Sequence, residues 1–383
     1  MSAKSASQPL RVLSVVGTRP EAVKMAPVVQ AIAGDARLRG HLCVTAQHRE
    51  MLDQVLAHFD LKADTDLDLM RRAQGLDYIT SAVLEGMGPV LTAFDPHWVV
   101  VQGDTTTTFA ASLAAFYRKI KVAHVEAGLR TGNIYSPWPE EMNRKLTSQL
   151  ATLHFAPTEG ACANLKAEGV PADRIVVTGN TVIDALIWTR DKIFADPTLQ
   201  ASIAKAYPFL DPTRRMILVT GHRRENFDGG LERVFRALAV LARRTDVQVV
   251  FPVHLNPKVQ EAANAILDGI GSVHLIPPQP YRDFVWLMAQ SYLIVTDSGG
   301  IQEEAPGLGK PVLVTRDTTE RPEAVVSGTV ELVGTDAEKL LARATALLDD
   351  HVQYERMSRA YNPYGDGRAA ERIARSLINA AIP

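Results

Sequence analysis

The chain has 383 residues, of which 46% are apolar and 22% are charged, and its formal net charge is −2. A chain of this length exceeds the size at which a single hydrophobic core usually divides, so we expect two domains. Basic and acidic residues are interspersed, which excludes the basic stripe that binding to nucleic acid or to an anionic membrane requires. A small-molecule partner is favoured instead.

The cysteines and the N-terminal segment bear on the compartment. Cys43 and Cys162 stand in apolar or helical contexts without CxxC or His–Cys spacing, a pattern that indicates neither a disulfide framework nor a structural zinc site. The first ten residues lack the apolar core of a signal peptide, and no later stretch approaches about 18 uninterrupted apolar residues. We therefore expect a cytoplasmic protein without a membrane-spanning segment.

Short β-branched runs, each followed by a helix-length amphipathic segment, recur along the first half of the chain. They lie at 11–16, 41–45, 98–102, 121–126, 152–156 and 174–178. This βαβ rhythm predicts a doubly wound parallel sheet and therefore the α/β class.

The same rhythm restarts after a turn-rich segment at 191–213. Strands are predicted at 215–220, 247–253, 272–277, 292–297, 310–315 and 329–334. The restart predicts a second sheet and a domain change near 190–210. The alternative is one sheet of about a dozen strands, a width that is uncommon. A last helix is expected over 367–381, packed on either domain.

Polar residues are concentrated directly after the strands. The segments are GTRPE, QGDTTT, VEAGLRTG, TGHRREN, PVHLNP, PPQPY, TDSGG and TRDTTERPE. Ligands of open α/β sheets bind outside the carboxyl ends of the strands. Two sheets with such edges predict a ligand site in a cleft between two domains.

Three acids are candidates for proton transfer. Asp104 and Glu126 each end an apolar strand, where partial desolvation raises a carboxyl pKa toward the useful range. Asp104 has an alternative role as the cap of the next helix. Glu140 and Glu141 follow the proline-rich SPWP and are expected in a first helical turn, whose dipole favours anions. Dipole complementation alone fits Glu141 better, so we infer an acid group of Asp104, Glu126 and Glu140.

A serine and two glycines, Ser298, Gly299 and Gly300, follow a strand and open a helix. Bare backbone N–H groups at a helix N-terminus can bind a phosphate, although a tight strand-to-helix turn would also require glycine. Glu303 and Glu304 follow one turn later, where a glutamate can accept both hydroxyls of a ribose.

Cationic side chains are expected at the same edges. Arg19 and Lys24 follow the first strand, His222 and Arg223 follow a later one, and Arg321 precedes a proline. Solvation at the surface is the competing interpretation for Arg19 and Lys24. Because these charges exceed what a neutral metabolite needs, we expect a nucleoside diphosphate derivative. GxGxxG, Walker A and HExxH motifs are absent from the sequence, so we expect chemistry without a metal or redox cofactor.

Ten motifs in order, from about residue 11 to 372, carry a family resemblance. They are GTRPEAVKMAP, TAQHREMLDQ, QGDTTTT, HVEAGLRTG, SPWPEEMNR, TGNTVIDAL, TGHRREN, PVHLNP, TDSGGIQEEAP and RDTTERPEA. Together they resemble the bacterial non-hydrolysing UDP-N-acetylglucosamine 2-epimerases. The resemblance implies a glycosyltransferase-B-type architecture, with two Rossmann-like domains facing a deep cleft, usually in a homodimer. Residues 1–190 and the C-terminal helix 367–383 would form the catalytic domain, and residues 191–366 the UDP-binding domain.

The resemblance also implies the reaction. UDP-GlcNAc and UDP-ManNAc interconvert by anti elimination of UDP, an enzyme-bound 2-acetamidoglucal and re-addition, which supplies ManNAc units for cell-surface polysaccharide. By motif, Asp104, Glu126 and Glu140 match the acid/base group, and His222 matches the histidine that helps to hold the departing diphosphate. The positions that match the nucleotide and diphosphate site are Arg19, Lys24, Gln279, Phe284, Ser298, Gly299, Gly300, Glu304 and Arg321.

Family members are often activated by UDP-GlcNAc at a second site, which would involve Gln47, Arg223 and His254. The chain departs from the family pattern at two positions. Ala73 stands where some members have an arginine, and Gln102 replaces the histidine that commonly precedes Gly-Asp. The strength of activation therefore stays open.

Three other function classes remain alternatives. A glycosyltransferase on the same architecture would need an acceptor, and a hydrolysing epimerase would release free ManNAc. A non-catalytic nucleotide-sugar sensor would keep the binding residues without needing the acids.

Overall fold

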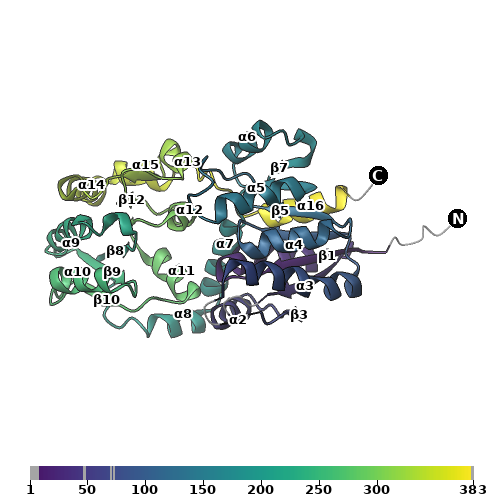
Figure 1. Ribbon diagram of the computed structural model, residues 1–383. Coiled ribbons are helices and arrows are strands. Elements are labelled where there is room, and N and C mark those ends of the chain that lie inside the picture. Colours follow the sequence, from purple (N-terminus) through teal and green to yellow (C-terminus); the bar gives the residue numbers. More distant parts are fainter. Residues whose placement is uncertain (1–7, 46–48, 70, 72–73, 381–383) are drawn as a thin grey trace. The chain divides into compact units, whose positions relative to one another are not determined.

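The computed structural model describes residues 8–45, 49–69, 71 and 74–380, and within them it forms two parallel sheets flanked by helices (Figure 1). The chain divides into two compact units, the first reaching Ala185 and resuming at Tyr364, the second spanning Leu186–Pro363. The α/β class is confirmed, and the alternative of one wide sheet is wrong. The first division follows Ala185, five residues before the expected boundary at 190. The second follows Pro363, three residues before the expected boundary at 366.

The sheet of the first unit has seven parallel strands in the order β3-β2-β1-β4-β5-β6-β7. They are β1 Leu10–Val16, β2 Leu38–Val44, β3 Thr65–Asp66, β4 Trp98–Gln102, β5 Lys121–Val125, β6 Leu153–Ala156 and β7 Ile175–Val177. Six of these strands match the predicted runs. The strand β3 was not predicted, because its two residues are too few to show an alternating pattern.

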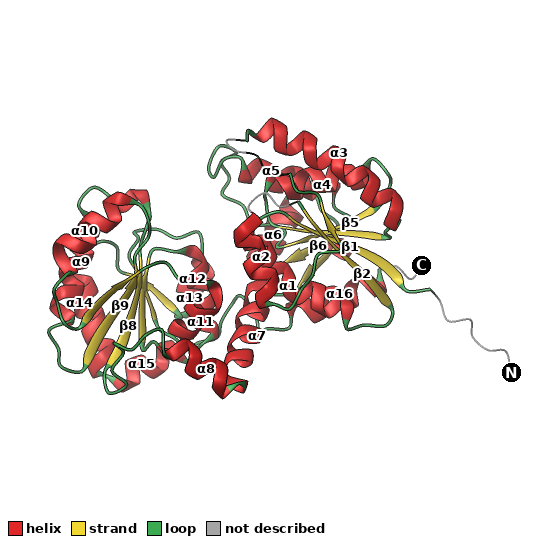
Figure 2. Ribbon diagram, turned by 90° about the horizontal axis from the view of Figure 1, so that it is seen from below, coloured by secondary structure: helices red, strands yellow, loops and turns green. Residues whose placement is uncertain are grey.

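Helices cover both faces of this sheet, which is why β4 is buried at every residue. Figure 2 shows α3, α4 and α5 on one face and α1, α2 and α16 on the other. The helices are α1 Arg19–Ala33, α2 Arg49–His58, α3 Leu76–Phe94, α4 Thr106–Phe116, α5 Glu140–Leu150, α6 Glu159–Ala167, η1 Ala172–Arg174 and α16 Ala369–Asn379. Helix α7, Thr181–Ala195, crosses from the first unit into the second.

The last helix, α16, belongs to the first unit and packs against α1. Asp184 binds its N-terminus by accepting the backbone N–H groups of Ala369 at 3.2 Å and Ala370 at 2.8 Å. Burial raises the pKa of Asp184 to about 6. This answers the question, open in the sequence, of which domain carries the last helix.

The second unit repeats the design with six parallel strands in the order β10-β9-β8-β11-β12-β13. The strands are β8 Arg215–Thr220, β9 Val247–Pro252, β10 Val273–Ile276, β11 Leu293–Thr296, β12 Val312–Val314 and β13 Val330–Leu332, all of them predicted. The helices are α8 Pro197–Ala204, η2 Arg224–Asn226, α9 Gly230–Leu241, α10 Pro257–Leu267, α11 Tyr281–Gln290, α12 Gly299–Gly307, α13 Pro322–Ser327, α14 Ala337–Asp349 and α15 His351–Ser358. Within this unit α9, α10 and α14 cover one face, and α11, α12 and α13 the other (Figure 2).

The two sheets share a topological feature that locates ligand sites. In each, the chain winds outward from the first strand and then reverses, so that β1 lies beside β4 and β8 beside β11. Ligands of doubly wound sheets bind beyond the carboxyl ends of the strands at such a switch point. Among the described residues, no helix is both long enough and apolar enough to cross a membrane.

Candidate functional site

A buried carboxylate, Glu21, joins the two loops at the β1/β4 switch point. Its Oε2 accepts the backbone N–H groups of Gly17 at 3.1 Å and Thr18 at 2.7 Å. Its Oε1 accepts the hydroxyls of Thr105 at 2.7 Å and Thr108 at 3.0 Å. Burial raises the pKa of Glu21, and these hydrogen bonds oppose the rise. The loop after β1 and the loop that carries Asp104 are thereby fixed to each other.

Asp104 occupies the turn between β4 and α4. The cap of α4 is Thr105, whose hydroxyl accepts the N–H of Thr108 at 3.1 Å, so the alternative role of Asp104 as a helix cap is wrong. The side chain of Asp104 is 29% exposed and pairs with the Arg144 guanidinium at 2.5 Å. Burial raises the pKa of Asp104 and Arg144 lowers it, while the nearby charges of Glu126 and Glu140 raise it. The three predicted acids are thus electrostatic neighbours.

Glu126 follows β5 and is held by two donors. Its Oε2 accepts hydrogen bonds from Lys24 Nζ at 2.5 Å and from Gln102 Nε2 at 2.7 Å. Lys24 is therefore a partner of a buried carboxylate, and simple solvation at the surface is wrong for it. The backbone of Glu126 has φ of 61°, a left-handed conformation that costs a non-glycine residue about 1–3 kcal/mol. Such strain at a strand end is typical of positions where a side chain must be aimed at a site.

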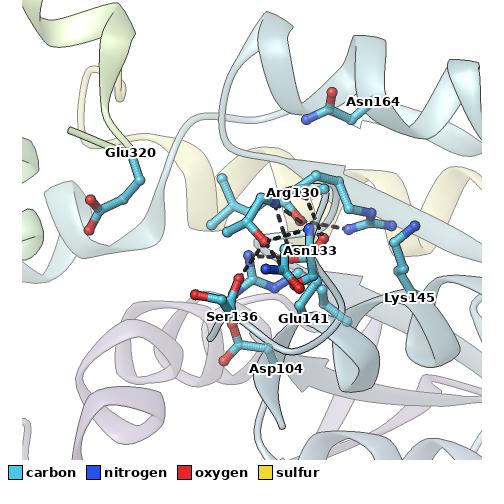
Figure 3. A network of polar contacts seen from close by, with 12 residues as sticks. Asp104, Arg130, Asn133, Ser136, Glu141, Lys145, Asn164 and Glu320 are labelled. Carbon is cyan, nitrogen blue, oxygen red and sulfur yellow. Dashed lines mark hydrogen bonds and ion pairs between the residues drawn. The ribbon is translucent and has the colours of Figure 1, made fainter. Parts of the chain in front are cut away.

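The neighbouring glutamates Glu140 and Glu141 lie in the first turn of α5, as predicted, but in different surroundings. Glu141 is fully buried and accepts the backbone N–H groups of Thr131 and Gly132 at 3.1–3.2 Å (Figure 3). It also pairs with Arg144 at 3.4 Å. Glu140 is partly exposed, and its side chain has no hydrogen bond or ion pair among the described residues. Glu141 therefore holds the loop before α5, and Glu140 is left available to a ligand.

The loop itself is fixed from a second side by Arg130. This guanidinium donates to both carboxylate oxygens of Glu168, at 2.9 and 2.7 Å, and to the Ser148 hydroxyl at 3.0 Å. Beyond it, Tyr135 and Trp138 are 73% and 63% exposed. The loop thus has a rigid base and an exposed aromatic tip.

His124 holds the turn that carries Asp104 through a hydrogen bond to its backbone. It is fully buried in β5, and its Nε2 donates to the carbonyl oxygen of Gly103 at 2.7 Å. Burial lowers the pKa of His124 to about 3, so the ring is neutral. Glu21, Arg144 and His124 were not among the site residues predicted from the sequence. The Thr18-x-x-Glu21 spacing of a capping box was a signal for the first of them.

In the second unit, His222 and Asp297 meet at the β8/β11 switch point. Asp297 is fully buried, and its Oδ2 accepts the backbone N–H groups of His222 and Arg223, both at 2.8 Å. The Nδ1 atom of His222 lies 3.6 Å from Asp297 Oδ1. The rings of His222 and His254 are stacked, with centroids 5.1 Å apart. The structure therefore brings together a histidine that was predicted and a carboxylate that was not assigned a role.

The N-terminus of α12 lies directly after β11, as predicted for a phosphate-binding helix start. Ser298 is its N-cap, and Gly299 and Gly300 are its first residues, without a left-handed backbone. The turn alone therefore does not require glycine. A Cβ on Gly299 would lie 3.0 Å from Glu320 Oε1, whereas one on Gly300 would have room. The backbone N–H groups of this first turn can bind an anion by donating hydrogen bonds to it.

Two arginines near α12 form ion pairs with glutamates. Arg321, the N-cap of α13, donates from Nε to the buried Glu303. Arg316 bridges Glu225 at 2.7 Å and Glu320 at 2.6 Å. Glu303 therefore orients Arg321, while the neighbouring Glu304 is partly exposed.

The remaining predicted residues are distributed as follows. Gln279, between β10 and α11, accepts the Tyr207 hydroxyl at 2.8 Å, and Phe284 is a partly buried residue of α11. Arg19, the first residue of α1, has no ion pair or hydrogen bond from its side chain within the described ranges. Gln47 and Ala73 lie outside the described residues. Among the residues that are described, no group of three or more His, Cys, Asp or Glu side chains is arranged to hold a metal ion.

Comparison with known proteins identifies the family of the chain. The family model described as UDP-N-acetylglucosamine 2-epimerase matches residues 30–378. The UDP-N-acetylglucosamine 2-epimerase of Yersinia pestis is 61% identical over 371 residues, covering 97% of this chain and 99% of that protein. The enzyme of that name from Escherichia coli strain K12 is 58% identical over 374 residues, 97% of this chain and 100% of that protein.

A solved structure agrees in fold as well as in sequence. The crystal structure of the Neisseria meningitidis UDP-GlcNAc 2-epimerase bound to UDP-GlcNAc superposes with a TM-score of 0.87 at 50% identity, covering 97% of this chain and all of that chain. The chain belongs to the UDP-N-acetylglucosamine 2-epimerase family.

Proposed function

We propose that this protein is a non-hydrolysing isomerase that interconverts UDP-GlcNAc and UDP-ManNAc. The observation that carries the proposal is the acid group of the first unit. Asp104, Glu126 and Glu140 come from three separate segments, yet the charges of the latter two act on Asp104. The family membership, at 61% identity to a curated relative, supports the same activity.

The reaction begins with elimination. The C1–O bond to UDP breaks, the C2 proton leaves to a carboxylate, and a C1=C2 double bond forms in the bound 2-acetamidoglucal. The C2 hydrogen is not activated by a carbonyl, so C1–O cleavage leads and positive charge develops on the sugar, which nearby carboxylates stabilise. UDP then adds back to C1 while a proton is delivered to the opposite face of C2, which inverts that carbon.

The surroundings of the acids fit two opposite proton-transfer roles. Glu126 accepts hydrogen bonds from Lys24 and Gln102, whereas burial raises the pKa of Asp104 toward the range of a proton donor. Environments that differ in this way allow one site to hold an acid and a base together. Glu140, without a partner of its own among the described residues, is the third group in reach of the reacting sugar.

In this proposal the residues that bind UDP belong mainly to the second unit. His222, Arg321 and the first turn of α12 stabilise the departing diphosphate, because its negative charge grows as the C1–O bond breaks. Glu304 accepts the ribose hydroxyls, and Gln279 and Phe284 are further positions of the nucleotide site. In the first unit, Arg19 and Lys24 are the cations that we assign to the diphosphate.

Turnover in heavy water tests the reaction class. Incubation with UDP-GlcNAc alone should place deuterium at C2 and yield UDP-ManNAc, both visible by NMR. A glycosyltransferase would show no exchange without an acceptor, and a hydrolysing epimerase would release free ManNAc. Either result would overturn the proposal.

The acid variants test the residues. Asp104→Asn and Glu126→Gln keep size and hydrogen-bonding capacity but remove the proton-transfer group, so turnover should fall by about a hundredfold or more. Asp173→Asn, on the exposed η1 turn, is the matched control and should leave turnover unchanged. Undiminished turnover in Asp104→Asn would remove this residue from the mechanism.

Finer features belong to the same proposal. A second UDP-GlcNAc bound near Gln47, Arg223 and His254 would activate the enzyme, which sigmoidal substrate kinetics would reveal. The proposal extends to a homodimer in the cytoplasm, whose ManNAc product feeds a cell-surface polysaccharide. Analytical ultracentrifugation would test the dimer, since a single species at the 41.8 kDa monomer mass would contradict it.

A further inference from the structure

One buried oxygen in the second unit is left without a hydrogen bond. Asp297 is fully buried at the end of β11, and its Oδ1 has no hydrogen-bond partner. A buried charged oxygen in this state is costly, on the order of 1–3 kcal/mol or more. A buried polar atom without a partner in a native structure requires a physical explanation.

The orientation of Asp297 is fixed by its other oxygen. Oδ2 accepts the backbone N–H groups of His222 and Arg223 at 2.8 Å and lies 3.5 Å from the side-chain amide of Asn226. These donors hold the carboxylate plane, so Oδ1 is directed at Nδ1 of His222, 3.6 Å away. At this distance the two atoms are close but not hydrogen-bonded.

The charges around His222 come from three loops. Burial lowers the pKa of His222, Asp297 raises it, and His254 and Arg223 lower it. Nδ1 of the stacked His254 accepts the backbone N–H of Asn256 at 3.1 Å, and Arg223 lies 3.4 Å from Glu320. His222 is thus neutral in the free protein near neutral pH, with Asp297 as the group that favours its protonation.

We propose that Asp297 is the positioning residue of His222: it accepts a hydrogen bond from Nδ1–H when the imidazolium forms, and it directs Nε2–H at the diphosphate of the nucleotide. This inference rests on the proposed function, because the diphosphate is the anion that completes the charge balance. The free pair is a carboxylate beside a neutral ring. In the complex, the imidazolium of His222 lies between the carboxylate of Asp297 and the diphosphate.

Proton uptake is the consequence that distinguishes this role from a structural one. Because ligand binding raises the pKa of His222, the complex takes up a proton at any pH between the free and the bound value. UDP affinity should therefore fall as pH rises through this window, by up to about tenfold per pH unit. A carboxylate that served only to hold the backbone would produce no such linkage.

Asp297→Asn separates the two roles. The carbonyl oxygen of asparagine can still accept the two backbone N–H groups, but its NH₂ would then face Nδ1 and donate to it. The ring would be held neutral, with its only proton on Nε2. UDP should still bind, more weakly at pH 7, and without the added proton.

The experiment is titration calorimetry of UDP into wild type and Asp297→Asn at pH 8, in two buffers of different ionisation enthalpy. The terminal phosphate of UDP ionises near pH 6 and contributes equally to both proteins. Wild type should take up close to one proton more than the variant, and His222→Gln should match the variant. The matched control is Asp246→Asn, at the opposite, amino end of β9, which should behave as wild type.

The outcomes separate the inference from the proposed function. Equal proton uptake in wild type and Asp297→Asn, with UDP bound to both, would overturn the inference alone. Failure of both to bind UDP would overturn the proposed function as well. If the variant does not fold, histidine ¹⁵N spectra of the wild-type UDP complex decide: both ring nitrogens of His222 protonated supports the inference, and an unprotonated Nδ1 overturns it.

Discussion

The two switch points use the same device with one difference. In the first unit Glu21 ties the loop after β1 to the loop after β4, and in the second Asp297 ties the loop after β8 to the strand end of β11. All oxygens of Glu21 are occupied by two backbone and two hydroxyl donors. Asp297 keeps Oδ1 unoccupied and facing His222.

This difference separates carboxylates whose oxygens are all hydrogen-bonded from a carboxylate that has one oxygen without a hydrogen bond. Glu141 is of the first kind, since it is fully buried and binds Thr131, Gly132 and Arg144. The two histidines differ in their partners. His124 is buried away from any carboxylate partner and is neutral, whereas His222 lies beside one. Among these carboxylates, complete occupation of both oxygens therefore distinguishes Glu21 and Glu141 from Asp297.

The largest effect should come from removing a saturated carboxylate. Glu141→Ala takes away the acceptor of two backbone N–H groups and a partner of Arg144, which should cost about 2–3 kcal/mol of unfolding free energy. Glu140→Ala should cost at most about 1 kcal/mol, because it removes only a dipole interaction in the first turn of α5. Hydrogen exchange of α5 amides measures both. Equal losses in the two variants would break the division between them.

An intermediate effect concerns pH and the buried histidine. The pKa of His124 is about 3 when folded and near 6.5 when unfolded, so stability is full above pH 6.5 and is lost as pH falls toward 3. Between pH 7 and 5 His124 should account for about 2 kcal/mol of lost stability. His124→Gln, which can still donate to Gly103, should lose that much less, as read from hydrogen exchange in β4 and β5. The exposed His351→Gln is the control, and an unchanged acid sensitivity in His124→Gln would contradict a buried neutral ring.

The smallest effect should come from Glu21→Gln. Its carbonyl can accept the two backbone N–H groups and its amide can donate to Thr105 and Thr108, so the unfolding free energy at pH 7 should change by no more than about 1 kcal/mol. The raised pKa of Glu21 means that wild type loses stability as pH rises from 4.5 through the folded value, and the variant should not. Denaturant unfolding across pH 4–8 compares them. A large loss of turnover in Glu21→Gln would assign this residue more than a holding role.

Local patterns in the sequence were sufficient for the secondary structure and for the edge that carries the site. Alternation of β-branched runs with amphipathic segments predicted every strand except β3, because buried parallel strands must be apolar along their whole length. Polar residues after those strands indicated the carboxyl edge, since the turn chemistry there is local. The helix starts at Ser298 and Glu140 were also visible in the sequence.

Only the tertiary structure decided which of these polar residues touch. Lys24 and Glu126 are 102 residues apart, and His222 and Asp297 are 75 apart. Their contacts depend on where each sheet reverses its strand order, which no short window of sequence contains. The same holds for the contrast between Glu140 and Glu141. Adjacent identical residues differ because α5 turns one of them toward the Thr131 loop and leaves the other partly exposed, a choice that packing of the whole unit makes.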